Sequence, residues 1–400
     1  MTSSVPPVLF VESYPQVLAG QQRTLLAMLD AWPADGPEPV VVAPAGGPLP
    51  DALPGVAGGR VRFELLPPRP ALNRYGGAIY RDRGLAKLKT LAAAAGGVAD
   101  ARRFLKRLRP AAVFCNDMRG ILTLGVAAKS LRIPLTTWDK LDKPHGRGGW
   151  MDRLELPLCD RVLVISEAVK TKFPPAQLRR YAAKLKTVRN GIDFAPLDAA
   201  EPDRRRFGLA DDDFVVLLAG TVTHRKGVDR VLGVLPDLLD AVPHAVVAVA
   251  GAPSSDQDRA YADGLPNRDH PRVRWLGQRD DLPTLMHSCD LFCLPSRTEG
   301  MGRVLVEAMA ARKPCVGSRA GGIPEVIADG ETGLLFDGDD PADLLRSLTV
   351  LAHAPERRRR MGEAGRTRAE TRFHGPTQIG KVTEEILDLV SPKSGLPQSW

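Results

Sequence analysis

Residues 291–318, LFCLPSRTEGMGRVLVEAMAARKPCVGS, contain a short apolar run, a glycine-containing turn, a helical pattern and a second short run. Short apolar runs on either side of a helical pattern indicate a strand–helix–strand unit. Two glutamates, Glu299 and Glu307, lie on either side of the turn. They indicate either an ordinary loop before an amphipathic helix, or a site for an anionic ligand that also carries hydroxyl groups.

The same alternation recurs along most of the chain. Strand-like runs occupy residues 8–12, 40–43, 112–116, 135–138, 162–166, 215–220, 246–251, 273–277, 291–296 and 315–318. Helical patterns between them include residues 21–32, 121–131, 227–242 and 303–311. Repeated strand–helix alternation predicts parallel sheets with helices on both faces, and it occurs twice. The predicted fold class is therefore α/β, with two doubly wound parallel-sheet domains that face each other across a cleft.

A polar stretch rich in Pro and Asp, residues 190–214, has little periodicity and is interpreted as the linker between domains. The predicted domains are residues 1–195 and 196–375. Residues 376–390 are predicted to form a helix that crosses back to the first domain, and residues 391–400 a loose tail. A chain of 400 residues agrees with two domains of ordinary size.

Composition narrows the class of protein. The formal charge is +8, with basic clusters at residues 101–110, 204–206 and 357–360. A solvated helix face explains most such clusters, but positive patches also attract phosphates and anionic lipid surfaces. Nucleic acid is disfavoured because no aromatic residues interleave with the basic ones. The five scattered cysteines lack the spacing of a zinc site and are expected to be buried thiols. Without a signal peptide or a membrane-spanning run, we expect a cytoplasmic protein, either free or peripheral at the inner face of the cytoplasmic membrane.

The turn before residue 303 suits an anion. Gly300 and Gly302 allow the backbone to turn tightly, and the helix that starts near Arg303 presents free N–H groups. Glu307 lies about one turn into that helix, roughly 6 Å along its axis. Two carboxylates around a phosphate site would suit a nucleotide-sugar, with ribose at one end and hexose at the other. An ordinary helix start explains the same residues equally well.

A second segment favours the ligand site. Residues 217–232, LLAGTVTHRKGVDRVL, read as a strand, a polar loop and a helix, with Arg225 and Lys226 at the start of the helix. Two cations at the carboxyl end of a strand would neutralise a departing diphosphate. The P-loop motif is absent, and no G-x-G-x-x-G follows a strand, which argues against an NAD-dependent oxidoreductase.

The ordered set of motifs resembles glycosyltransferase family 4, which has the GT-B fold. It comprises VLVISEAVKTKF, VRNGID, GTVTHRKGVD, the two glutamates of E-x7-E, GGIPEVI and DGETGLLF, and the resemblance extends over about residues 8–390. It implies retaining transfer of a hexose from a nucleotide-diphosphate sugar, UDP- or GDP-linked, to a hydroxyl of a glycan, lipid-linked or small-molecule acceptor in bacterial glycoconjugate or polysaccharide biosynthesis. No cofactor and no obligatory metal are implied.

The resemblance assigns roles to matching residues. The first domain would bind the acceptor and the second the donor. Arg225 and Lys226 would hold the diphosphate, Glu307 the ribose, and Glu299 the transferred sugar and its developing positive charge. Gly20 matches a glycine loop that faces the donor phosphate. The remaining donor-binding assignments are Arg279, near the base, and the turn residues Gly300, Met301, Gly302, Arg303 and Val304.

The acceptor side departs from the family pattern. Where the family often has a histidine after the strand IPLTTW, this chain has Asp139, which is either a catalytic hydrogen-bonding group or a plain loop residue. Front-side displacement and a covalent double displacement both stay open. The alternatives to a transferase are a GT-B nucleotide-sugar epimerase and a non-catalytic nucleotide-sugar-binding protein. A basic patch in the first domain could also hold the protein against an anionic membrane.

Overall fold

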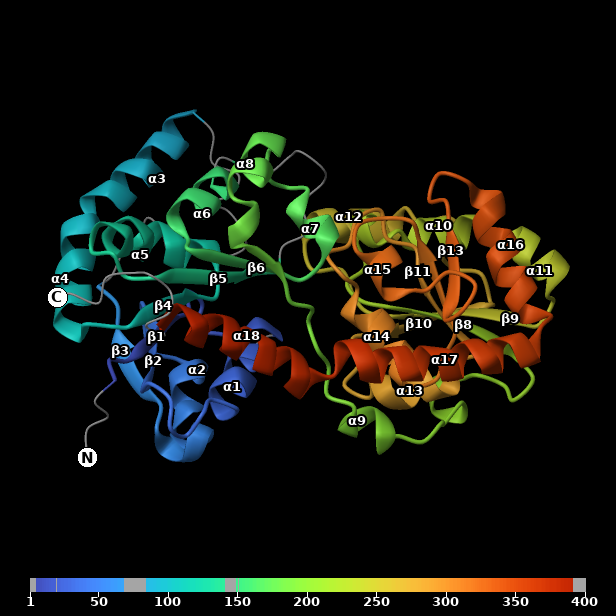
Figure 1. Cartoon of the computed structure of the whole chain (residues 1–400). Coiled ribbons are helices and arrows are strands. Elements are labelled where there is room, and N and C mark those ends of the chain that lie inside the picture. The colour runs from blue at the N-terminus through green and yellow to red at the C-terminus, as the bar shows by residue number, and fades with distance from the viewer. Residues whose placement is uncertain (1–4, 19, 68–83, 141–148, 150, 391–400) are drawn as a thin grey trace. The chain divides into compact units, whose positions relative to one another are not determined.

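The computed structural model describes residues 5–18, 20–67, 84–140, 149 and 151–390, so the predicted tail at 391–400 lies outside the described residues. The contacts divide the chain into two compact units (Figure 1). Unit 1 comprises Met1–Ile165, Val169–Val188 and Gln378–Trp400, and unit 2 comprises Ser166–Ala168 and Arg189–Thr377. The domain limits of the sequence analysis stay predictions.

Within its described residues, unit 1 is built on a seven-stranded sheet of order β3-β2-β1-β4-β5-β6-β7. Every pairing in it is parallel. The strands are β1 (Val8–Val11), β2 (Pro39–Ala43), β3 (Arg62–Leu65), β4 (Ala112–Cys115), β5 (Leu135–Asp139), β6 (Arg161–Val164) and β7 (Leu185–Thr187). The central strands are buried along their whole length because helices cover both faces of the sheet.

Helices follow most strands of unit 1, as parallel connections require. They are α1 (Gly20–Asp30), α2 (Pro48–Asp51), α3 (Gly84–Gly96), α4 (Val98–Leu108), α5 (Met118–Ser130), α6 (Asp152–Leu158) and α8 (Pro175–Arg180), with turns η1 (Leu53–Gly59) and η3 (Ala182–Lys184). The side chain of Asp117 caps α5 by accepting hydrogen bonds from the amides of Arg119 and Gly120. This cap fixes where α5 leaves the end of β4.

Unit 2 has a six-stranded parallel sheet over its described residues, in the order β10-β9-β8-β11-β12-β13. The strands are β8 (Phe214–Ala219), β9 (Ala245–Ala250), β10 (Val273–Gly277), β11 (Leu291–Leu294), β12 (Cys315–Ser318) and β13 (Gly333–Phe336). The helices are α9 (Ala195–Asp198), α10 (Val228–Gly233), α11 (Leu235–Ala241), α12 (Asp256–Asp263), α13 (Leu282–Ser288), α14 (Arg303–Ala310), α15 (Ile323–Val326), α16 (Pro341–Ala352) and α17 (Pro355–Phe373), with turns η4 (Arg205–Phe207) and η5 (His224–Lys226).

The division between the units falls within two helices, the short α7 (Glu167–Lys170) and the longer α18 (Gly375–Val390). In α7 the division falls after Ala168. α18 begins in unit 2 and belongs to unit 1 from Gln378 onward, where Glu385 pairs with Arg161 of β6. Among the described residues, no helix has both the length and the apolar character needed to span a bilayer.

The structure confirms the predicted α/β class, with a parallel Rossmann-like sheet in each unit, and all five cysteines are buried. Sequence patterning missed the edge strands β3, β7 and β13, which are only 4, 3 and 4 residues long. It also joined α10 and α11 into one helix. The helix breaks after Gly233 because Pro236 in the first turn of α11 lacks an N–H and obstructs the preceding turn.

Candidate functional site

Two loops of unit 2 emerge side by side. Residues 220–223 follow β8 and lead into η5, while residues 295–302 follow β11 and lead into α14. β8 and β11 pair in parallel, with Leu291 opposite Val216, so both loops leave the same edge of the sheet. The carboxyl ends of neighbouring parallel strands are where doubly wound sheets bind ligands.

An ion pair joins these loops. The Lys226 Nζ lies 2.5 Å from Glu299 Oε2, and both side chains are largely buried. The Arg225 Nη1 lies 3.5 Å from the same oxygen and donates to the carbonyl of Thr298 at 3.1 Å. About half of the Arg225 side chain remains exposed. The structure thus brings three predicted site residues together, two cations around one carboxylate.

Close backbone approaches hold the Glu299 loop. Gly302 has a φ of +83° and begins α14 in the left-handed conformation that glycine adopts without strain. Gly321, which follows β12, has a φ of +53°, and a Cβ there would lie 2.1 Å from the Glu299 carbonyl oxygen. The amide of Gly322 donates to that oxygen at 2.8 Å. The loop after β12 therefore packs against the glycine turn and holds it in place.

Glu307 lies one turn into α14 and is half-buried. Burial raises the pKa of its carboxyl, and the guanidinium of Arg303, 3.9 Å away, partly opposes the shift. Because no side chain caps α14, the amides at its first turn are available to a ligand. The Glu299 loop thus leads through Gly302 directly into an uncapped helix start.

The other predicted donor residues are placed differently. Met301 is buried and Val304 half-buried, and the carbonyl of Gly300 accepts a hydrogen bond from Ser166 Oγ at 2.6 Å. Arg279 is engaged by Asp281 through two hydrogen bonds of 2.6 and 2.7 Å, which raise the pKa of its guanidinium. Its place beside the nucleotide base stays a prediction.

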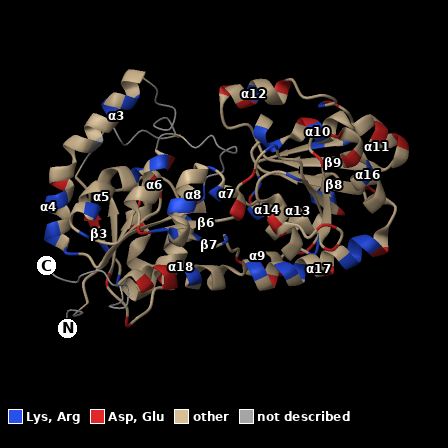
Figure 2. Cartoon of the chain, turned by 45° about the horizontal axis from the view of Figure 1, so that its top comes forward, with Lys and Arg blue, Asp and Glu red and all other residues tan. Residues whose placement is uncertain are grey.

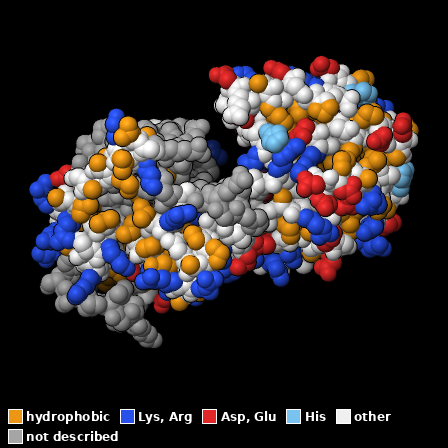
Figure 3. Space-filling view, turned by 90° about the horizontal axis from the view of Figure 1, so that it is seen from above, with side chains coloured by type: hydrophobic (Ala, Val, Ile, Leu, Met, Phe, Trp, Pro, Cys, Tyr) orange, Lys and Arg blue, Asp and Glu red, His pale blue; other side chains and the backbone are white. Residues whose placement is uncertain are grey.

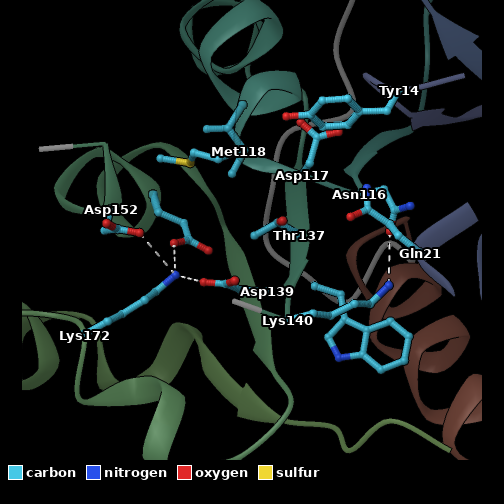
Figure 4. Close-up of a pocket in the computed structure, with 13 residues that line it drawn as sticks. Tyr14, Gln21, Asn116, Asp117, Met118, Thr137, Asp139, Lys140, Asp152 and Lys172 are labelled. Carbon is cyan, nitrogen blue, oxygen red and sulfur yellow. Dashed lines mark hydrogen bonds and ion pairs between the residues drawn. The ribbon is translucent and has the colours of Figure 1, made fainter. Parts of the chain in front are cut away.

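Unit 1 contains a pocket of about 170 Å³ at the carboxyl ends of its central strands (Figure 4). Side chains from the ends of β4 and β5 and from the starts of α5 and α6 line it. Asp139, the last residue of β5, is among them. Gly20 is the first residue of α1 and is exposed. The pocket thus places one predicted residue, Asp139, beside several that the sequence did not single out.

Lys172 is the centre of a buried charge cluster in this pocket (Figure 4). Its ammonium contacts Asp139, lies 2.7 Å from Glu155 Oε2, and lies 3.6 Å from Asp152 Oδ1. All four residues are at most 9% exposed. Buried ions persist only when they are paired, so the lysine and the three carboxylates depend on one another. Spacing along the sequence gave no signal for this cluster because Asp139, the α6 pair Asp152 and Glu155, and Lys172 come from three separate parts of the chain.

A buried glutamate, Glu12, fixes the end of β1 beside the pocket. It accepts hydrogen bonds from Asn116 Nδ2 at 2.7 Å, from Gln22 Nε2 at 3.1 Å and from the amide of Tyr14 at 2.9 Å. Burial and the nearby Asp117 carboxylate raise the pKa of Glu12, and the hydrogen bonds from Asn116, Tyr14 and Gln21 oppose the shift only in part. The network joins β1, α1 and β4 and so holds the wall of the pocket.

Known proteins resemble this chain in sequence and in fold. The chain matches the family model described as Glycosyltransferase Family 4 over residues 18–195, and the model described as Glycosyl transferases group 1 over residues 200–368. It is 31% identical over 281 residues to the alpha-maltose-1-phosphate synthase of Mycolicibacterium smegmatis, which covers 64% of this chain and 71% of that protein. The chain therefore belongs to family 4 of the glycosyltransferases.

A second relative from the same species is a GDP-mannose-dependent alpha-(1-6)-phosphatidylinositol monomannoside mannosyltransferase. It is 33% identical over 238 residues, which span 56% of this chain and 62% of that protein. Among solved structures, Anabaena Alr3699/HepE in complex with UDP aligns with a TM-score of 0.73 over 96% of this chain and 100% of that chain, at 20% identity. At that identity the likeness concerns the fold, which is GT-B.

The buried cluster predicts a strong effect of Lys172→Met. Removing the cation leaves three buried carboxylates without it, so the free energy of unfolding should fall by about 3–5 kcal/mol. Chemical denaturation measures this loss. The control is Lys129→Met, which removes an exposed lysine 3.6 Å from Asp160 and should cost less than about 1 kcal/mol. Equal stability of the two variants would contradict the cluster.

Proposed function

We propose that the protein is a retaining glycosyltransferase that moves a hexose from a UDP- or GDP-linked sugar to an acceptor hydroxyl. The observation that carries the proposal is the meeting of Arg225, Lys226 and Glu299 at the carboxyl ends of β8 and β11. Family membership supports it, and so do a GDP-mannose-dependent relative and a fold neighbour in complex with UDP. A glycan or lipid-linked acceptor in bacterial glycoconjugate synthesis fits the same relatives.

The ion pair indicates how the donor would bind. Without a ligand, Glu299 is the anion that Lys226 and Arg225 contact. A diphosphate carries more charge than one carboxylate and would attract both cations. Glu299 would then turn to the hydroxyls of the sugar and stabilise positive charge at its anomeric carbon. Donor binding would therefore break the Lys226–Glu299 ion pair and replace it with contacts between these residues and the donor.

The rest of the donor follows from this placement. The uncapped amides at the start of α14, beside Met301 and Gly302, would meet the distal phosphate, and Glu307 would accept hydrogen bonds from the ribose. Burial raises the pKa of Glu307, so its carboxylate form, and with it this contact, would be lost as the pH falls. Arg279 would lie beside the nucleotide base.

Transfer then needs no protein nucleophile. The bond from the anomeric carbon to the diphosphate oxygen breaks, the acceptor oxygen forms its bond on the same face, and its proton passes to the departing oxygen. Arg225 and Lys226 stabilise the charge that leaves. In unit 1, Asp139 would accept a hydrogen bond from the acceptor. The loop at Gly20 would face the donor phosphate, for which the glycine leaves space. Because two side-chain cations neutralise the diphosphate, we propose that no metal is obligatory and that EDTA leaves turnover unchanged.

A thermal-shift panel tests donor binding. UDP, GDP and ADP are each added to the wild type, Lys226→Ala and Glu307→Ala. A nucleotide at a hundredfold its dissociation constant should add about 2.7 kcal/mol of stability to the wild type. We expect one nucleotide to be selective and both variants to lose its effect. Arg346→Ala, which removes an exposed cation of unit 2, is the control and should respond as the wild type does. Absence of any shift at millimolar nucleotide would refute the donor site.

A product assay tests transfer itself. The protein is incubated with UDP-glucose or GDP-mannose, with and without phosphatidylinositol monomannoside and simple sugars, and released nucleotide and glycosylated product are measured. Glu299→Gln should lower turnover about 100-fold by removing charge stabilisation at the anomeric carbon. Glu331→Gln, on an exposed residue of unit 2, should leave it unchanged. Release of free sugar and nucleotide regardless of acceptor would instead support an epimerase.

We also propose that unit 1 contacts an anionic membrane surface through α3 and α4. Leu85 and Leu88 of α3 are 77% and 60% exposed, and Arg103 and Arg107 of α4 are exposed nearby along the chain. Figure 2 shows basic residues on both helices, and Figure 3 shows hydrophobic side chains beside basic ones on this unit. Apolar side chains next to cations suit an interface of hydrocarbon and anionic headgroups.

Vesicle co-sedimentation tests this surface. The wild type should bind vesicles of phosphatidylcholine with phosphatidylglycerol more strongly than phosphatidylcholine alone, and salt should weaken binding. Leu85→Gln with Leu88→Gln should reduce binding, whereas Val350→Gln, on an exposed apolar residue of unit 2, should not. Equal binding by the two variants would rule out α3 as the contact.

A further inference from the structure

Arg297 binds the Arg225–Lys226 turn through both its guanidinium and its amide. Its guanidinium donates to both oxygens of Asp229, at 2.8 and 2.6 Å, and to the carbonyl of His224 at 2.8 Å. Its amide donates to the carbonyl of Arg225 at 2.8 Å. One residue of the β11 loop therefore binds η5 at two carbonyls and α10 at one carboxylate.

Side chains of the η5 turn also bind the loop that contains Arg297. Arg225 reaches the carbonyl of Thr298, and Lys226 reaches Glu299, the two residues that follow Arg297. The segments 224–229 and 297–299 are about seventy residues apart in the chain, yet each supplies side chains that bind the other. The two loops thus form one cross-linked unit at the edge of the sheet.

Asp229, the partner of Arg297, is itself fixed. It lies in the first turn of α10, and its Oδ1 accepts a hydrogen bond from the hydroxyl of Tyr261 at 2.5 Å. Burial opposes its ionisation, but the hydrogen bonds from Arg297 and Tyr261 outweigh burial and lower the pKa of Asp229. Arg297 therefore meets a charged, immobilised carboxylate, which is the arrangement in which a two-bond arginine contact is strongest.

We propose that Arg297 is a positioning residue of the donor site: it fixes the η5 turn so that Arg225 and Lys226 present their charges together to the diphosphate. This inference rests on the proposed function. Arg297 acts through its neighbours, because its own donors are directed at Asp229 and His224. A lysine cannot replace it fully, since one ammonium cannot match the planar fork that serves a carboxylate and a carbonyl at once.

Loss of this positioning role should weaken the binding of a diphosphate but not that of a nucleoside. Loss of Arg297 would free the turn, and the two cations would have to be ordered when the diphosphate binds, at a cost in affinity. The ribose contact proposed at Glu307 lies on α14, and the base contact proposed at Arg279 lies between β10 and α13, so both are outside this cross-link. Affinity for a nucleoside diphosphate should therefore fall while affinity for the matching nucleoside does not.

The experiment compares UDP with uridine and GDP with guanosine on the full-length protein. Calorimetric titration measures the diphosphates, and NMR titration measures the nucleosides. Arg297→Met should weaken binding of the diphosphate about tenfold or more and that of the nucleoside less than about twofold. Arg297→Lys should fall between Arg297→Met and the wild type. Asp229→Asn should resemble Arg297→Met, and the double variant should add little because the pair acts as one contact.

The matched control is Arg272→Met, which removes another arginine of unit 2 that pairs with a largely buried aspartate, Asp213, at 2.8 Å. It should leave the ratio of the two affinities unchanged, and thermal melting shows whether each variant is folded. A diphosphate affinity of Arg297→Met within twofold of the wild type overturns the inference. So does a parallel loss of nucleoside and diphosphate. If the wild type binds neither nucleotide, the proposed function fails first.

Discussion

The ion pair between Lys226 and Glu299 is the interaction around which the candidate site of unit 2 is arranged. It joins residues 73 positions apart, and it exists because β8 and β11 are neighbours in the sheet. The chain leaves β8 in one direction through β9 and β10 and returns on its other side at β11, so the strand order reverses there. Loops diverge at such a point and leave room for a ligand at the carboxyl edge. In unit 1, the order reverses in the same way at β1, beside the pocket that Asp139 lines.

Charge sets what each of these places can bind. In unit 2, the carboxylate of Glu299 holds the position that a more highly charged phosphate group would take from it, and Arg225 remains half-exposed to receive one. In unit 1, the ammonium of Lys172 is already paired with three carboxylates. The unit 2 site therefore offers the half-exposed Arg225 to a ligand, whereas Lys172 of the unit 1 pocket is already paired. A sugar donor that carries a diphosphate needs cations beside its phosphates, and an acceptor needs hydrogen-bonding groups that position its hydroxyl.

Sequence patterning predicted the two parallel sheets because buried strands in such sheets are continuous apolar runs, and these are visible in 215–220 or 246–251. It predicted Glu299 and Lys226 because each lies in a local motif with glycine. It could not find Arg297 with Asp229, or Lys172 with Asp152, since those pairs form only when separate strands bring their loops together. Edge strands such as β3 were missed for a related reason. Its side chains are half exposed and form ion pairs, so the apolar run that marks a central strand is absent.

The account's central claim is that donor binding exchanges the Lys226–Glu299 pair for contacts with a nucleoside diphosphate. A crystal structure of the protein with the nucleotide that stabilises it tests this most directly. The account predicts a phosphate oxygen within hydrogen-bonding distance of Lys226 Nζ, ribose hydroxyls at Glu307, and the carboxylate of Glu299 turned away from the lysine. A nucleotide bound elsewhere, or bound with the ion pair still intact at 2.5 Å, would contradict it.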